Sequence, residues 1–252
     1  MFLMKDHDAH SGKPTLQQPV RLSFYATPEH QCSYLENKQA ITLFADPHAE
    51  LDNHIYSTLS QYGFRRSGNH IYRPSCPTCS ACIPIRIPVN EFKPKRSQNR
   101  TWRKNQDLDV KVLGAEFREE QHELYKKYIS FRHPDGGMND PDPDKYIEFL
   151  TSEWSITRFV EFRLESRLVA VVVLDQLEDG FSSVYTFFDP DLEHRSLGTL
   201  GILWSIEYTR ETGQEWLYLG YLIRECAKMS YKTQFQPQQS FIQGEWLYEQ
   251  KP

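Results

Sequence analysis

The cysteines of this 252-residue chain are concentrated in one short segment. Cys76, Cys79 and Cys82 are each separated by two residues, whereas Cys32 and Cys226 lie far from them in the sequence. Thiolates bind zinc and iron–sulfur clusters, and Cys-x2-Cys-x2-Cys is a spacing found in such metal loops. One hypothesis is therefore a zinc or iron–sulfur site at these three cysteines, with Cys32 as the fourth ligand. The other is a group of reduced, buried thiols, because free cysteines often behave as small hydrophobic residues.

A segment of small residues, His194–Leu200, has the composition of an anion-binding loop. The first amides of a helix lack partners within the helix and attract negative charge. Gly198 would let a ligand approach the backbone and Arg195 would add a positive charge; alternatively, Gly198 simply permits a tight turn. We expect an activated acyl group to lie between this loop and the next strand, near Arg195, Ser196, Gly198, Thr199, Tyr218 and Tyr221.

The stretch from Lys93 to Gln106 is strongly basic, although the whole chain has a net charge of −5. In a helix, Arg96, Arg100 and Arg103 lie on one face because they are four and three residues apart. Cations without acidic neighbours are typical of a contact with a phosphate backbone, and a solvated linker helix is the alternative. The stretch holds no acidic residue and six cations: Lys93, Lys95, Arg96, Arg100, Arg103 and Lys104.

Transfer of an acyl group to an amine needs a neutral amine, a place for the oxyanion and a route for the departing proton. An α-amino group has a pKa of about 7.7–8.0, so a modest base suffices and no protein nucleophile is required. The acidic candidates for the base are Asp175, Glu161 and Asp189, and Tyr185 is a candidate hydroxyl donor together with Tyr218 and Tyr221. Acids at strand ends also hold turns, and tyrosines on strands also serve as packing residues.

The elements that would position these groups follow one another between residues 167 and 223. Leu168–Leu174 is an uncharged, β-branched run that predicts a strand covered on both faces. Ser182–Phe188 predicts a second strand, Thr199–Thr212 a helix that ends at Gly213, and Trp216–Ile223 a third strand. Strand, strand, Arg-x-x-Gly loop, helix and strand in this order resemble the core of the GCN5-related N-acyltransferases.

The remaining chain also predicts alternating helices and strands, and hence an α/β (α+β) fold. A helix is expected from Asp46-Pro47 to Tyr62, followed by a hairpin over Phe64–Arg73. A second helix over Phe117–Phe131 is expected to bury Phe117, Leu124, Tyr128 and Phe131. We expect four parts: a flexible leader over residues 1–18, a Cys-containing N-terminal domain over 19–92, a basic linker over 93–106 and a catalytic domain over 107–252.

The composition excludes several classes of protein. A hydrophobic content of 39% is ample for a packed core and far from that of a disordered chain. The N-terminus lacks the apolar centre of a signal peptide, and the longest apolar run, residues 168–174, is too short to span a membrane. Five cysteines, an odd number, do not suggest a secreted disulfide framework. We therefore expect a soluble, cytoplasmic protein.

Several motifs together resemble one family, the bacterial aspartate/glutamate leucyltransferases, which are related to the eukaryotic arginyl-tRNA–protein transferases. They keep the family's order over roughly residues 20 to 248. In the first half they are Cys32–Leu35, Gly63–Ser67, Tyr72–Arg86 and Phe92–Gln98. In the second half they are Ser183–Pro190, Arg195–Thr199, Tyr218–Ile223 and Lys228–Lys232.

The resemblance implies an enzyme that transfers leucine from leucyl-tRNA to an N-terminal Asp or Glu, marking the acceptor protein for N-degron (N-end rule) degradation. It implies no cofactor for the transfer and no membrane partner. The basic segment would face tRNA phosphates, and the loop at Arg195–Thr199 with Tyr218 and Tyr221 would hold the aminoacylated 3′ end. Cations that could recognise the acidic N-terminus are Arg73, Arg86 and Arg132. Leu35 stands where the eukaryotic relatives have a second cysteine, so their iron–sulfur site does not carry over directly.

Three other functions are compatible with parts of the pattern. An arginyl-tRNA–protein arginyltransferase would share the same motifs. An acetyl-CoA-dependent N-acetyltransferase would use the Arg195–Thr199 loop for a pyrophosphate. A non-catalytic RNA-binding module would combine the basic segment with a metal site at the cysteines.

Overall fold

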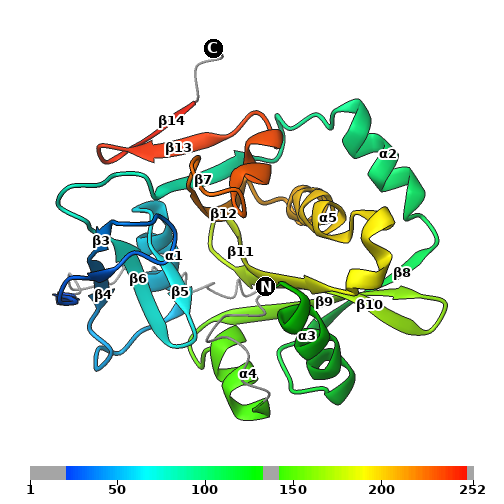
Figure 1. Cartoon of the computed structure of the whole chain (residues 1–252), viewed down its shortest axis with the longest axis horizontal. Helices are drawn as coiled ribbons and strands as arrows, with labels where there is room; N and C mark the ends of the chain where they lie inside the picture. Colours follow the sequence, from blue (N-terminus) through cyan, green and yellow to red (C-terminus); the bar gives the residue numbers. More distant parts are fainter. Residues whose placement is uncertain (1–20, 133–141, 249–252) are drawn as a thin grey trace, which may run out of the picture.

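The computed structural model describes residues 21–132 and 142–248, so the predicted leader over residues 1–18 lies outside the described chain. The fold is mixed α/β, as the sequence predicts, and Figure 1 shows a large central sheet with a smaller β-rich part at one end. None of the described helices is both long and apolar enough to cross a bilayer.

The large sheet has eight strands in the order β14-β13-β7-β12-β11-β10-β9-β8. Within it, only β11 and β12 pair in parallel. The strands are β7 (Ile83–Pro88), β8 (Leu108–Gly114), β9 (Ile156–Leu164), β10 (Arg167–Gln176), β11 (Gly180–Phe188), β12 (Trp216–Leu222), β13 (Gln239–Ile242) and β14 (Glu245–Tyr248).

Helices cover both faces of this sheet, which explains why β10 has an uninterrupted apolar run. Helix α5 (Leu197–Glu211) packs on one face against residues such as Val172 and Leu174. Helices α3 (Glu119–Arg132) and α4 (Pro143–Leu150) pack on the other face against Val171 and Val173. The prediction of a strand buried on both sides is therefore confirmed.

The smaller part contains a four-stranded sheet in the order β1-β4-β6-β5, the two-stranded sheet β2-β3 and helix α1. Its core, which includes Tyr56, Phe64 and Ile71, also contains Leu177 and Tyr218 of the large part, so the two parts share one interface. The elements are β1 (Phe24–Ala26), β2 (His30–Gln31), β3 (Gln39–Ala40), β4 (Thr42–Ala45), α1 (Asn53–Gln61), β5 (Arg65–Ser67) and β6 (His70–Pro74). Strand β7 falls within the predicted N-terminal domain of residues 19–92, yet it pairs with β12 and β13 of the large sheet.

Two predicted details of the helices are wrong. Helix α1 begins at Asn53 rather than at Asp46-Pro47, because the Asp52 carboxylate caps it by accepting a hydrogen bond from the Ile55 amide at 2.7 Å. Phe117 and Phe131, both predicted to be buried by the second helix, are 42% and 61% exposed. That helix, α3, begins at Glu119, and its buried face is formed by Gln121, His122, Leu124, Tyr125 and Ile129.

The predicted basic helix is confirmed as α2 (Arg96–Lys104). It lies beside α5 in Figure 1, and its Trp102 packs against the hydrophobic core on that face of the sheet. The short helices η1 (Pro190–Arg195) and η2 (Ser230–Gln234) precede α5 and follow β12, respectively.

Candidate functional site

The two parallel strands β11 and β12 separate in the middle of the large sheet. They pair only from Gly180 to Ser182 on β11 and from Trp216 to Tyr218 on β12. Beyond these residues each strand continues without the other, so carbonyl groups of both strands become available to side chains. The sheet is therefore open at the end of β12, the strand that follows α5. Helix and strand correspond to the predicted elements Thr199–Thr212 and Trp216–Ile223.

Two cationic side chains enter this split. Arg65 of β5 donates hydrogen bonds from Nη2 to the carbonyl of Ser183 at 2.5 Å and from Nη1 to the carbonyl of Leu219 at 3.3 Å. Lys232 of η2 donates from Nζ to the carbonyls of Leu219 at 2.9 Å and Tyr221 at 2.7 Å. Both cations therefore lie within hydrogen-bonding distance of the same oxygen atom, that of Leu219.

Gly220 is required for this arrangement. It adopts a φ of +73°, in the left-handed region that glycine tolerates best, at a register shift in the pairing of β12 with β7. A Cβ atom at this position would lie 1.3 Å from Nη1 of Arg65. The glycine of the Tyr218–Ile223 motif thus makes room for a guanidinium.

Lys232 is buried, with 8% of its surface exposed. Desolvation and, to a smaller extent, the positive charge of Arg65 together lower the pKa of its amine from the ordinary value to about 7. The amine can consequently gain or lose a proton near neutral pH, when a charged group approaches it.

A cavity of about 410 Å³ adjoins the split, and Tyr221 of β12 forms part of its wall. The Tyr221 hydroxyl donates to the carbonyls of Gly63 and Tyr72, which fixes this wall to the smaller part of the molecule. Burial raises the pKa of Tyr34, another lining residue, to about 12, with a smaller opposite contribution from Arg65. The smaller part therefore forms most of the wall of a half-open cavity, and Tyr221 connects that cavity to the split.

The four cysteines that the sequence grouped together all line this cavity: Cys32, Cys76, Cys79 and Cys82. Burial and the neighbouring thiols raise the pKa of Cys82 to about 12, so this thiol stays protonated. Within the described chain, no three ligating atoms that include a cysteine sulfur lie within 4.8 Å of one another. The thiols are gathered around one space, but their spacing in the structure does not fit a formed metal centre.

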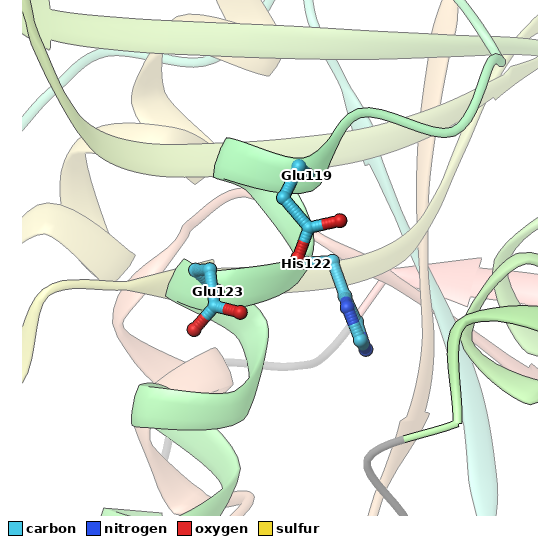
Figure 2. A group of neighbouring side chains, drawn as sticks. All are labelled: Glu119, His122 and Glu123. Carbon is cyan, nitrogen blue, oxygen red and sulfur yellow. The ribbon is translucent and has the colours of Figure 1, made fainter.

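One group of possible ligands does meet that spacing, namely Glu119, His122 and Glu123 at the start of α3 (Figure 2). His122 is 2% exposed, and neither ring nitrogen has a hydrogen-bond partner. Its ring lies against Phe117 and Tyr146, however, and the two carboxylates are exposed. Glu123 already forms an ion pair with Lys126 at 2.5 Å, so a cation would have to displace that lysine.

Asp175, the first predicted base, lies in a fully buried ion pair. Its two oxygens accept hydrogen bonds from Nε and Nη2 of Arg66, each at 2.6 Å, and both side chains are 0% exposed. The Thr157 hydroxyl at 2.7 Å and the Tyr56 hydroxyl at 3.1 Å complete the set of donors. A carboxylate with no exposed surface, surrounded by four hydrogen-bond donors that include a guanidinium, has the geometry of a structural pair.

The other two predicted acids are also held by cations. Glu161 is buried and accepts from Gln121 at 2.9 Å and from Arg163 at 2.8 Å. Asp189 is buried, caps η1 and accepts from Lys127 at 2.5 Å. Hydrogen bonds from Lys127 and the η1 backbone outweigh the desolvation, and they lower the pKa of Asp189.

The predicted tyrosines lie in three different environments. Tyr185 packs among aromatic rings that include Tyr125 and Phe149, and burial raises its pKa. The Tyr218 hydroxyl donates to Asp179 at 2.8 Å, whereas Tyr221 borders the cavity. Tyr185 and Tyr221 both lie beyond the residues that pair β11 with β12, and of the three tyrosines Tyr221 is the one that lines the cavity.

In the predicted anion-binding loop, the arginine is already paired with an acidic side chain of the same chain. Arg195 forms a two-pronged ion pair with Asp107, at 2.8 and 2.9 Å, which compensates its charge. Ser196 has a left-handed conformation and precedes α5, which contains Gly198 and Thr199. A Cβ at Gly198 would lie 3.1 Å from the Phe188 ring, so this glycine allows α5 to pack closely on β11.

The three arginines predicted to recognise an acidic N-terminus are spread over the molecule. Arg73 donates to the carbonyl of Tyr62 at 2.9 Å, and Arg132 lies exposed at the end of α3. The Arg86 guanidinium lies between the rings of Trp216 and Trp246, 3.6 and 4.4 Å from their centroids. The hydrogen bonds to the carbonyls of the split come instead from Arg65 and Lys232, which were not among the predicted residues. The only sequence signal for them was that both belong to motifs of the resemblance.

The six predicted phosphate-binding cations are gathered on and before α2, and all are exposed: Lys93, Lys95, Arg96, Arg100, Arg103 and Lys104. None of them forms an ion pair with a carboxylate of the described chain. Lys104 donates to the carbonyl of His194 at 2.7 Å, which ties α2 to the segment before α5. This basic face is therefore available to an anionic partner.

Comparison with known proteins gives a consistent result over nearly the whole chain. Family models for the N terminus and C terminus of arginine-tRNA-protein transferase match residues 30–100 and 120–242. An aspartate/glutamate leucyltransferase from Hahella chejuensis is 51% identical over 226 residues, which cover 90% of this chain and 97% of that protein. One from Saccharophagus degradans is 50% identical over 227 residues, or 90% of this chain and 96% of that protein. Among solved structures, L-PGS from Bacillus licheniformis is similar with a TM-score of 0.42 and 11% identity, over 56% of this chain and 47% of that one.

Proposed function

The chain belongs to the aspartate/glutamate leucyltransferases, and from this membership we propose that it transfers leucine from leucyl-tRNA to the N-terminal Asp or Glu of acceptor proteins. It is an aminoacyltransferase of the aminoacyl-tRNA–protein transferase class. The observation that carries the proposal is about 50% identity to these relatives over 90% of the chain. The added leucine marks the acceptor for N-degron degradation.

The chemistry needs no cofactor. The α-amine of the acceptor attacks the ester carbonyl of leucyl-tRNA, an amide bond forms, and the bond to the ribose oxygen breaks. The proton lost by the amine ends on that ribose oxygen, so the step is balanced without an oxidant or a nucleotide. The protein must hold the amine and the ester together and assist the proton transfer.

We propose that the reaction takes place at the split between β11 and β12, in a core of the GCN5-related N-acyltransferase type. Two features support this location: the strands diverge there around Arg65 and Lys232, and a cavity that Tyr221 lines lies next to them. Tyr221 is the predicted residue that fits this site best. We assign structural roles to Asp175, Glu161 and Asp189, because each is buried and paired with a cation.

The tRNA is proposed to lie along α2. Its cations are exposed and unpaired with carboxylates, which favours contact with a phosphate backbone. The Arg195–Thr199 loop stays a candidate for the 3′ end, although Asp107 would have to release Arg195 for a phosphate to bind there.

A metal at Cys32, Cys76, Cys79 and Cys82 is a separate proposal, supported by the four thiols around one cavity. Their rearrangement to ligand spacing would be needed, and no step of the transfer depends on it. We expect anaerobically purified protein to contain about one structural zinc ion or one iron–sulfur cluster per chain, measured by elemental analysis. Metal content unchanged in a Cys79→Ser/Cys82→Ser variant would contradict the assignment.

The function itself is tested with radiolabelled leucyl-tRNA and a peptide that begins with Asp. We expect labelled peptide, loss of labelling after RNase treatment of the tRNA, and much weaker labelling with arginyl-tRNA. Transfer from arginyl-tRNA alone would make the chain an arginyltransferase. Acetylation of the peptide from acetyl-CoA without tRNA would favour an N-acetyltransferase, and RNA binding without any transfer would favour a non-catalytic module.

A further inference from the structure

Arg65 and Arg66 are neighbours on β5 with opposite electrostatic environments. Successive side chains of a strand point to opposite faces. Arg66 forms an ion pair with the carboxylate of Asp175, which compensates the charge of its buried guanidinium. Arg65 meets Lys232 instead, and over the described residues neither of these two cations forms an ion pair with a carboxylate.

Two neighbouring basic groups without an anion are costly to keep charged inside a protein, because each loses hydration and their charges repel each other. The carbonyls of Ser183, Leu219 and Tyr221 offset part of this cost through partial negative charge. Lys232 uses two of its three ammonium hydrogens in these bonds, so a donor is left over. The arrangement is that of an anion site whose negative charge comes from a ligand.

We propose that Arg65 and Lys232 bind the side-chain carboxylate of the acceptor's N-terminal Asp or Glu. The inference rests on the proposed function, which requires such a carboxylate close to the reacting amine. A side-chain carboxylate lies only two or three bonds from the Cα that bears the amine, so its recognition at the split positions the amine there as well.

Size and placement favour a peptide carboxylate over a tRNA phosphate. A half-open cavity of about 410 Å³ is lined by side chains such as Tyr34, Tyr72 and Tyr221, and its volume suits one or two residues of an extended chain. Tyr221 connects it to the split, because its side chain lines the cavity and its carbonyl accepts a hydrogen bond from Lys232. The exposed cations that suit a phosphate backbone lie elsewhere, on α2. Arg65 and Lys232 thus serve the acceptor, and the exposed cations of α2 serve the tRNA.

The test compares acceptor peptides that begin with Asp and with Asn, which have the same size but differ in charge. For the wild type, we expect kcat/KM to favour Asp strongly. In Lys232→Met this preference should fall about 10-fold or more, through KM for the Asp peptide, because a charge-assisted hydrogen bond is lost. The KM for leucyl-tRNA should not change. Arg65→Lys, which keeps the charge but loses the planar fork, should show a smaller loss of preference.

Lys111→Met is the matched control, because Lys111 is exposed on β8, and it should keep the preference of the wild type. If Lys232→Met does not fold, NMR of lysine-labelled wild-type protein replaces it, with Lys232→Arg used to assign the signal. The Lys232 signal should shift on addition of the Asp peptide and stay unchanged with the Asn peptide.

The outcomes separate this inference from the function. A wild-type protein that transfers no leucine contradicts the proposed function. Transfer with an Asp preference that survives in both folded variants overturns the inference alone. A higher KM for leucyl-tRNA with an unchanged Asp preference would assign the pair to the tRNA and would also overturn it.

Discussion

Replacement of Asp175 by asparagine is expected to lower the free energy of unfolding by about 3–5 kcal/mol, because the buried Arg66 guanidinium loses its charge partner. Both side chains of this pair are 0% exposed, so water cannot solvate the remaining cation without opening the core. Asparagine keeps the size of the side chain and one acceptor oxygen, and the loss therefore reports the charge rather than a cavity. Urea unfolding followed by circular dichroism measures the change.

Glu178→Gln provides the matched control, since it makes the same change of carboxylate to amide at the turn that follows β10. Glu178 pairs with His54, but the two side chains are 53% and 59% exposed, so solvent screens the interaction. This variant should unfold almost like the wild type. An Asp175→Asn protein that is as stable as the wild type but transfers no leucine would contradict the structural role and restore Asp175 as a candidate base.

The order of elements in the second half could be predicted because local patterns determine it. The run Leu168–Leu174 contains no polar residue and four valines, which favours a strand covered on both faces, and α3, α4 and α5 provide that cover. Gly213 adopts a φ of +76° at the end of α5, as a glycine at this position predicts. These features depend on neighbours in sequence, so the sequence contains the information.

The site could be predicted only in part, because its contacts join residues that are far apart in the chain. Arg65 and Arg66 are identical in type and adjacent, yet one reaches Leu219, 154 residues away, and the other reaches Asp175, 109 residues away. No local pattern distinguishes them. The acids Asp175 and Asp189 were sensible candidates by type, but their burial and their cationic partners follow from tertiary contacts alone.

Reversal of three charges on α2, in an Arg96→Glu/Arg100→Glu/Arg103→Glu variant, is expected to weaken tRNA binding on the order of 100-fold near 0.1 M salt. Each arginine that neutralises a phosphate releases a condensed counterion, so the loss of about three contacts should also reduce the slope of log Kd against log salt by about 2 to 3. The stability of the fold should change little, because these three side chains are exposed and form no ion pair within the described chain. Filter binding or fluorescence anisotropy with leucyl-tRNA over a range of salt concentrations measures both effects.

A control with the same change in net charge is available on the opposite face of the sheet. Arg118→Glu/Lys126→Glu/Lys145→Glu alters exposed cations just before α3, on α3 and on α4, which pack on the face opposite α5 and α2. If the tRNA lies along α2, this control variant should keep most of the affinity for tRNA and nearly the whole slope of log Kd against log salt. Its substitutions change only the long-range electrostatic potential at the tRNA and remove no phosphate contact. Equal losses in the two variants would mean that net charge, and not the face of α2, determines tRNA binding. A normal slope in the α2 variant would place the phosphate contacts on another surface.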